Sequence, residues 1–209
     1  MPPRLLTSCS ALPPRGGRCA CGLAKLRGPC VMGKLALQCF DHGSGDMMAT
    51  RGIDLMLNGR ARTVHAEENT PLLYVLRNDC GLKGTRYGCG ASQCGSCHVL
   101  LDGESVPACD TPLWAAEGKA VVTVEGLGEG GALHPLQQAF IDEQAAQCGY
   151  CLSGILVTAS ALLQRCPLPS ETQVREALDP HLCRCGTHNR IVRAVLRAAD
   201  VMAAHGAPT

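Results

Sequence analysis

The pattern of hydrophobic and polar positions changes at Ile53, where strand-like runs begin. Residues 53–57 have apolar side chains at 53, 55 and 57, residues 60–64 are more polar and end in Val64, and Asn58-Gly59 separates the two runs. Asn-Gly is the preferred pair for a two-residue hairpin turn, because both positions need positive φ. The pattern therefore predicts a β-hairpin from Ile53 to Val64.

Further strand signals and one short helix follow. Thr70-Pro71 predicts a helix start, with Thr70 as N-cap and Pro71 in the first turn. The buried face of this helix is expected to comprise Leu72, Leu73, Val75 and Leu76. Residues 99–101 with Asp102-Gly103 predict a second hairpin, and residues 120–124 a closing strand. Together these elements predict a small β-grasp-like α+β unit over residues 50–126.

After residue 126 the strand pattern ends and helical spacing takes over. Residues 127–133 are predicted to be a linker. Helices are expected from His134-Pro135 to about Gln144, over 150–164, from a Ser170 cap (with Gln173) to about Leu178, and from Thr187 or Asn189 to Ala204. The second half, residues 134–204, is therefore predicted to be an all-α four-helix-bundle domain, with 205–209 as a tail. The overall fold class is α+β.

Composition and charge narrow the function classes. Aromatic residues make up only 3% of the chain, so each small domain has a thin aliphatic core. Small domains of this kind usually need additional stabilisation by disulfides or a bound metal. A net charge of +1 gives no support for nucleic-acid binding, and no apolar run reaches the length of a transmembrane segment. The 15 cysteines are clustered at two- and three-residue spacings, which favours metal binding in a reducing compartment over a secreted disulfide scaffold.

The first cysteine set has the spacing of a plant-type ferredoxin. Its members, in the order C-x4-C-x2-C-x11-C, are Cys89, Cys94, Cys97 and Cys109. Gly88, Gly90 and Gly95 allow the tight loop that brings sulfurs together and lets amide N–H groups face an anionic cluster. This spacing predicts a [2Fe–2S] site.

A second set of four cysteines lies in the helical half. Cys148 and Cys151 stand before the second predicted helix, and Cys183 and Cys185 before the last. Helix N-termini favour thiolates. Two cysteine pairs contributed by two antiparallel helix pairs can also meet at one site across a bundle. Cys80 and Cys166 have no partners at ligand spacing and are expected to be packed or surface thiols.

Three other patterns compete with this interpretation. Cys94 to His98 matches the C-x-x-C-H string of haem attachment, but it leaves two cysteines unused, and we expect His98 to begin a strand and face solvent. A four-thiolate zinc site would predict a binding module, although C-x4-C-x2-C is not the spacing of paired zinc knuckles. Gly126, Gly128 and Gly131 imitate a dinucleotide fingerprint without its second strand.

The segment before the hairpin differs from the rest. Residues 1–48 mix proline, glycine, arginine and cysteine without a sustained period, and they lack the features of an export signal. We expect a disordered extension or a start codon placed too early.

Both cysteine sets, in order, carry a resemblance to a known family. The chain resembles the small iron–sulfur subunit of molybdenum hydroxylases, the xanthine dehydrogenase, aldehyde oxidase and carbon monoxide dehydrogenase superfamily. Within it the chain looks most like the small subunits of isoquinoline 1-oxidoreductase and nicotinate dehydrogenase. Besides the cysteine spacings, the matching motifs are residues 76–79 (Leu-Arg-Asn-Asp), 84–90 (Gly-Thr-Arg-Tyr-Gly-Cys-Gly), 147–151 (Gln-Cys-Gly-Tyr-Cys) and 182–187 (Leu-Cys-Arg-Cys-Gly-Thr).

The resemblance implies roles for particular residues. It assigns an outer [2Fe–2S] cluster to the first cysteine set and an inner one to the second. Gln147 would face the pterin of a molybdenum cofactor, in its cytosine dinucleotide form, and Cys185 would lie on the same side. Electrons would pass from molybdenum through the inner cluster and the outer cluster to an external acceptor.

The resemblance also implies partners. These are a large subunit that binds molybdenum and an electron acceptor, either a FAD subunit or a cytochrome. The expected compartment is the cytoplasm. The chain itself contains no acid–base pair or nucleophile and would carry electrons only. Two other functions are a stand-alone two-cluster ferredoxin and a zinc-stabilised interaction module. The cations Arg184, Arg190, Arg193 and Arg197 would form either a solvated face or an edge that docks the large subunit.

Overall fold

The computed structural model describes residues 50–128 and 131–204. The predicted extension at residues 1–48 and the tail at 205–209 lie outside the described residues.

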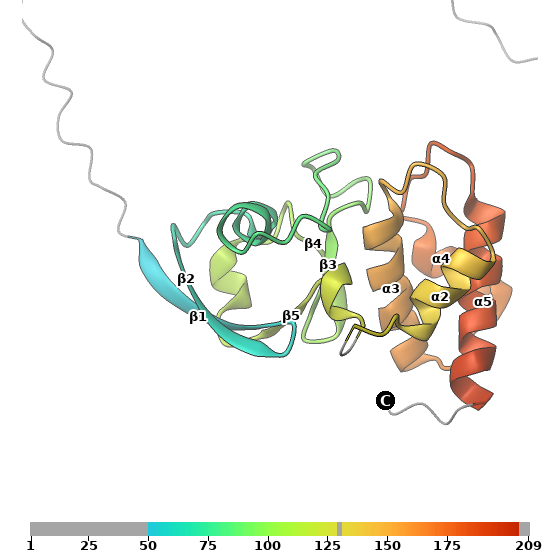
Figure 1. Ribbon diagram of the computed structural model, residues 1–209. Coiled ribbons are helices and arrows are strands. Elements are labelled where there is room, and N and C mark those ends of the chain that lie inside the picture. The colour runs from blue at the N-terminus through green and yellow to red at the C-terminus, as the bar shows by residue number, and fades with distance from the viewer. Residues whose placement is uncertain (1–49, 129–130, 205–209) are drawn as a thin grey trace, which may run out of the picture. The chain divides into compact units, whose positions relative to one another are not determined.

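Five strands form one mixed sheet in the order β2-β1-β5-β3-β4 (Figure 1). The strands are β1 (Arg51–Leu57), β2 (Arg60–Ala66), β3 (His98–Leu101), β4 (Glu104–Pro107) and β5 (Ala120–Val122). β1 and β5 pair in parallel at the centre, and the other pairs are antiparallel. The chain makes two hairpins and then returns to place its last strand between them, as predicted for a β-grasp unit.

Both predicted hairpin turns are confirmed. Asn58 and Gly59 have φ of 49° and 75°, and Asp102 and Gly103 have φ of 50° and 84°. Positive φ at both central positions gives the twist that matches antiparallel strands. Short-range sequence therefore specifies both hairpins.

The short helical segment begins differently from the prediction. It comprises α1 (Leu72–Tyr74) and the π-helical η1 (Val75–Asp79). Thr70 is not its N-cap: Pro71 occupies that position without a side-chain cap bond. The first helical amide, that of Leu72, instead donates to the Thr111 carbonyl at 2.8 Å, so no side-chain cap is needed.

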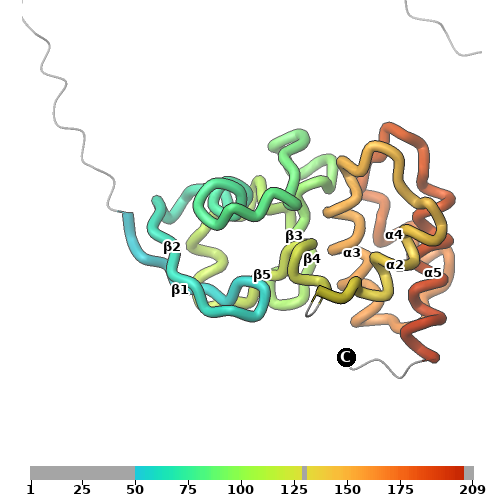
Figure 2. The backbone as a smooth tube through the Cα atoms, in the orientation of Figure 1, coloured from blue at the N-terminus to red at the C-terminus, as the bar shows by residue number. Residues whose placement is uncertain are grey.

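The four predicted helices are present after the sheet, and the backbone trace follows them in chain order (Figure 2). They are α2 (Pro135–Asp142), α3 (Leu152–Arg165), α4 (Glu171–Leu178) and α5 (His188–Ala204). His134 caps α2 and Ser170 caps α4, each in a capping box with the glutamine three residues later. Two 3₁₀ segments, η2 (Leu113–Ala116) and η3 (Val124–Gly126), flank β5.

Two apolar cores stabilise the fold, and β3 contributes to both. Val99 is fully buried in the core of the sheet with residues from β1, α1 and η1. Leu100, the next residue, belongs to the core of the helices, against which Val122 of β5 also packs. Successive side chains of a strand point to opposite faces of the sheet. One face therefore packs on α1 and η1, and the other face packs on α3.

Within residues 50–128 and 131–204, every helix is too short or too polar to span a bilayer.

Candidate iron–sulfur sites

The first cysteine set gathers around the loop that joins η1 to β3. Cys89 and Cys94 lie in this loop, Cys97 directly precedes β3, and Cys109 follows β4. The amides of Ala91 and Gln93 donate to the Cys89 sulfur at 3.3 and 3.2 Å, and the Cys89 amide donates to the Cys94 sulfur at 3.3 Å. N–H groups aimed at sulfur stabilise the thiolate form that binds iron.

The loop has the glycine geometry that the sequence predicts. A Cβ added at Gly88 would lie 2.5 Å from the Cys94 sulfur, so a side chain there would displace the thiol. Gly90 and Gly95 have φ of 68° and 74°, the left-handed region in which side chains are strained. These glycines allow the backbone to wrap closely around the sulfurs.

The environments of these thiols differ. The exposed Cys89 thiol has its pKa lowered to about 7 by the amide hydrogen bonds of Ala91 and Gln93. Burial raises the pKa of Cys97 to about 12, against hydrogen bonding from the Cys109 backbone. The site thus combines an exposed, readily ionised thiol with a buried one, for which a positively charged metal would offset the cost of ionisation.

The second set comes together at the start of two helices. Cys151 is the N-cap residue of α3, and Cys183 and Cys185 precede α5. The Cys148 and Cys185 sulfurs are 3.5 Å apart, although the two residues are 37 positions apart in the chain. All four thiols line one narrow cavity whose wall includes Gln147. The structure therefore brings the two predicted pairs together.

The same division of thiol environments recurs here. Backbone hydrogen bonding at Tyr150 and the Cys185 thiol lower the pKa of Cys148. Burial alone would raise the pKa of Cys183, but hydrogen bonds from Thr187 outweigh it and bring the value to about 7. Burial, followed by the neighbouring Cys183, raises the pKa of Cys151 to about 12.

The donor set fits a two-iron cluster. Over the part of the chain that the structure describes, no three His, Cys, Asp or Glu side chains converge on one metal-ion position. A [2Fe–2S] cluster requires a different arrangement, since each iron takes two thiolates from the protein. The second set provides two pairs of thiols around a shared cavity, and the first set provides thiols with backbone amides directed at sulfur.

The other predicted residues have mixed outcomes. Cys80 and Cys166 are partly buried and packed, as expected. His98 begins β3 as predicted, but the prediction that it faces solvent is wrong, because its Nδ1 lies 2.8 Å from the Ser105 hydroxyl. Residues 131–204 contain no strand, so the Gly126–Gly131 pattern does not open a dinucleotide-binding unit.

Two of the cations of the last helix form ion pairs within the chain. Arg193 pairs with Glu143, and Arg197 pairs with both Asp142 and Glu143, which ties α5 to the end of α2. Arg190 instead lines an apolar groove.

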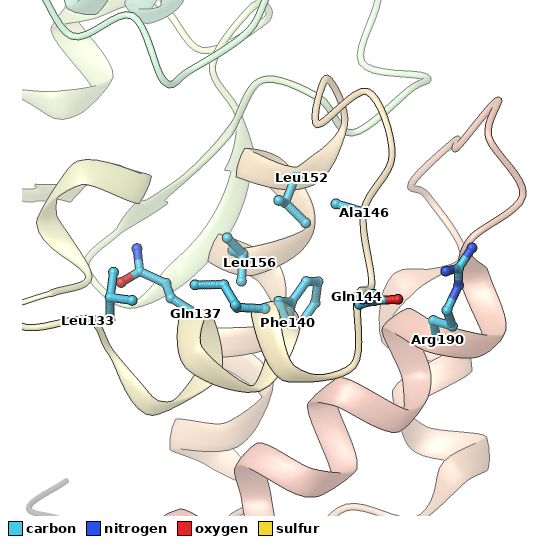
Figure 3. Close-up of a pocket in the computed structure, with 9 residues that line it drawn as sticks. Leu133, Gln137, Phe140, Gln144, Ala146, Leu152, Leu156 and Arg190 are labelled. Atoms are coloured by element: carbon cyan, nitrogen blue, oxygen red, sulfur yellow. The ribbon is translucent and has the colours of Figure 1, made fainter.

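This groove has a volume of 570 Å³ and lies beside the second cysteine set. Figure 3 shows Gln137 and Phe140 from α2, Leu152 and Leu156 from α3, and Arg190 at the start of α5 around it. Ala146, which also lines it, is the neighbour of Gln147. Sequence periodicity does not reveal such a groove, because its lining combines residues from three helices and from the segments on either side of α2.

Comparisons with known proteins agree with this geometry. Residues 55–123 match the 2Fe-2S iron-sulfur cluster binding domain, and residues 123–196 match the [2Fe-2S] binding domain. The fold and the two matches define the class as an iron–sulfur protein with two cluster-binding domains.

The relatives show the family. A nicotinate dehydrogenase subunit from Pseudomonas putida is 55% identical over 71% of this chain and 94% of the relative. The alpha subunit of isoquinoline 1-oxidoreductase from Brevundimonas diminuta is 48% identical over 70% and 97%. The structure of an aldehyde oxidoreductase from Desulfovibrio desulfuricans is 41% identical with a TM-score of 0.71, covering 74% of this chain and 17% of that one.

The chain belongs to the small [2Fe–2S] subunit family of the molybdenum hydroxylases. It is an electron-transfer subunit of an oxidoreductase complex, as the resemblance in its motifs predicted.

Proposed function

We propose that the two cysteine sets each hold one [2Fe–2S] cluster, and that the helical set faces a large molybdenum-binding subunit. The ligands would be Cys89, Cys94, Cys97 and Cys109 in the first set, and Cys148, Cys151, Cys183 and Cys185 in the second. The observation that carries the proposal is the cavity lined by all four helical-domain thiols. When bound, such a cluster accepts and releases one electron at a time.

The orientation is supported by what lies at the surface. Gln147 and Cys148 are both exposed at the mouth of the second site, where a pterin held by a partner could approach them and Cys185. Cys89 is exposed at the first site, and we assign that side to the external acceptor, a FAD subunit or a cytochrome. The pterin is proposed to be the cytosine dinucleotide form.

The apolar groove beside Gln147 supports docking of the large subunit to this face. Leu133 and Ile141 in its wall are 52% and 59% exposed, which is unusual for large apolar side chains gathered in one place. In the aldehyde oxidoreductase, the matched region is 17% of a longer chain, so the remainder of that protein is joined to it covalently. We propose that the corresponding partner of this chain is a separate subunit that fills the groove.

The domain limits and the compartment complete the proposal. A ferredoxin-like domain over residues 50–126 is supported by η3, which ends at Gly126, and a helical domain over 134–204 by the His134 cap. Residues 127–133 would link them. None of the ten cysteines in the described ranges forms a disulfide, which supports a reducing compartment such as the cytoplasm.

The test is metal analysis of the chain purified with whatever binds it. The wild type should contain about four irons and four acid-labile sulfides per chain, together with molybdenum from the co-purified large subunit. Cys148→Ser should lower iron to about two per chain and remove one of the two signals of the reduced protein. Cys166→Ser, a thiol outside both sets, serves as the matched control and should change neither.

Other results would contradict the assignment. Full iron content in Cys148→Ser, or zinc in place of iron in the wild type, would refute the ligand set. Four irons without any co-purifying molybdenum subunit would instead favour a stand-alone two-cluster ferredoxin.

A further inference from the structure

A partly buried chain of hydrogen bonds joins the sheet to the helices. The Thr158 hydroxyl of α3 lies 2.6 Å from the Ser105 hydroxyl of β4 and 2.9 Å from Nε2 of His181. The Ser105 hydroxyl lies 2.8 Å from Nδ1 of His98, and the two imidazoles meet edge to face at 4.8 Å between centroids. Thr158 is 8% exposed and His181 only 2%.

This chain of hydrogen bonds lies between the two cysteine sets. His98 directly follows Cys97, and His181 precedes Cys183 by two residues. Beside the side-chain contacts, the Leu182 amide donates to the Cys94 carbonyl at 3.1 Å. The two loops that supply the thiols are therefore in direct contact at the point where the four polar side chains meet.

The surrounding backbone leaves no space for the loops to shift. A Cβ at Gly95 would overlap the His181 ring, and a Cβ at Gly154 of α3 would overlap the Gly95 carbonyl oxygen. The first loop is thus packed between the His181 ring and the backbone of α3. Interlocked contacts of this kind leave few alternative arrangements.

We propose that Thr158, together with Ser105, His98 and His181, positions the two cysteine sets relative to each other. This inference rests on the proposed function, because it takes both sets as cluster ligands. Thr158 is the central residue, since its hydroxyl contacts partners from both domains. Its role is to hold the spacing across which an electron must pass, and it touches no reacting atom.

Polar contacts suit this role better than apolar ones. Hydrogen bonds are directional, and a buried polar group without its partner is costly, so a displaced loop would leave several groups unsatisfied at once. An apolar contact would tolerate sliding with a smaller penalty. Each hydroxyl in the chain can donate one hydrogen bond and accept another, which links the four side chains in one chain that Nδ1 of His181 does not join.

The experiment compares three variants of the full chain in its purified complex. Thr158→Val removes the hydroxyl at nearly constant volume, Thr158→Ser keeps it, and Ser105→Ala removes one arm of the hydrogen-bonded chain. Arg165→Gln is the matched control, because Arg165 also joins α3 to β4, through an exposed ion pair with Glu104 at 3.1 Å. The readouts are the dipolar splitting between the two reduced clusters in electron paramagnetic resonance and the midpoint of thermal unfolding.

Thr158→Val should retain full iron and sulfide but show a smaller or broadened dipolar splitting, because dipolar coupling falls with the cube of the separation. Its unfolding midpoint should fall by about 5 °C. Ser105→Ala should change both readouts in the same direction by less, and Thr158→Ser and Arg165→Gln should match the wild type.

An unchanged splitting in Thr158→Val would overturn the inference, and so would an equal change in Arg165→Gln. If Thr158→Val fails to assemble, Ser105→Ala decides the question by the same criteria. Low iron in the wild type would refute the proposed function itself, so the two failures are distinguishable.

Discussion

Gly154 in α3 is the position at which an ordinarily favourable substitution should be harmful. It lies inside a 14-residue helix, where alanine normally stabilises relative to glycine by about 1 kcal/mol. In this protein the α3 backbone lies directly against the loop that carries Cys94 and Cys97. A Cβ at Gly154 would overlap the Gly95 carbonyl oxygen and approach the carbonyl carbon of Ser96 to 3.2 Å.

Whether Gly154→Ala stabilises or destabilises the protein depends on two contributions, the cost of the steric overlap and the gain in helix propensity. Overpacking a well-packed interior costs about 1 to 3 kcal/mol. The upper end applies, because the overlapping atoms are backbone and cannot rotate away. Subtracting the propensity gain leaves a net destabilisation of about 2 kcal/mol for Gly154→Ala. For the two packed domains unfolding as one unit of about 150 residues, that corresponds to a fall of about 4 to 8 °C in the unfolding midpoint.

Thermal unfolding followed by the visible absorbance of the bound clusters measures this directly. Ala177→Gly in α4 is the reference for helix propensity; it should lose about 1 kcal/mol together with the contacts of its partly buried methyl group, and leave the iron content unchanged. Gly154→Ala should lower the midpoint and also alter the signal of the first cluster, because Gly95 lies in its loop. A midpoint equal to or above that of the wild type would refute the close packing of α3 on this loop.

Two further predictions concern the ends of helices. His134 caps α2 through Nδ1, which accepts from the Leu136 amide at 3.1 Å, and burial lowers the pKa of His134 below its ordinary 6.5. The unfolded chain therefore takes up the proton first, so stability that is present above pH 6.5 should be lost as the pH falls through that value towards the folded pKa. Urea unfolding across this pH range should show the fall in the free energy of unfolding in the wild type. His134→Asn, which keeps a cap, should show a smaller fall. Equal falls in the two proteins would contradict the role of His134 as the titrating cap. Arg197→Ala should cost at most about 1 kcal/mol, because its pairs with Asp142 and Glu143 involve a half-exposed guanidinium. High salt should shrink this difference, and a difference that salt leaves unchanged would point to packing instead.

Much of the candidate site could be predicted from local patterns. The spacing from Cys89 to Cys109 and the two short pairs of the helical half identify the thiols, because a tight loop can bring ligands together only at short separations. The groove beside Gln147 could not be predicted in the same way. Its lining residues come from α2, α3 and α5 and from the segments on either side of α2, so their proximity depends on how the helices pack.

The two places where local reasoning failed have one cause. Thr70 reads as an N-cap, but the Thr111 carbonyl, 39 positions beyond Leu72, accepts from the first amide of the helix. His98 reads as a solvent-facing strand residue, but Ser105 and Thr158 enclose it. Prediction from neighbouring residues assumes that such polar groups bond to a nearby side chain or to water. In both cases the structure supplies a hydrogen-bond partner from a distant part of the chain instead.

The amino-acid sequence alone predicted the hairpin turns, the start of α2, the cap of α4, the family and the identity of the clustered thiols. These depend on backbone angles and spacings within a few residues, so neighbouring residues suffice to specify them. Tertiary packing, in contrast, sets which loop lies against which helix, and it brings His98 and His181, 83 positions apart, together through one threonine of α3. Close packing and buried hydrogen bonds depend on distances between remote segments, and no local pattern encodes those distances.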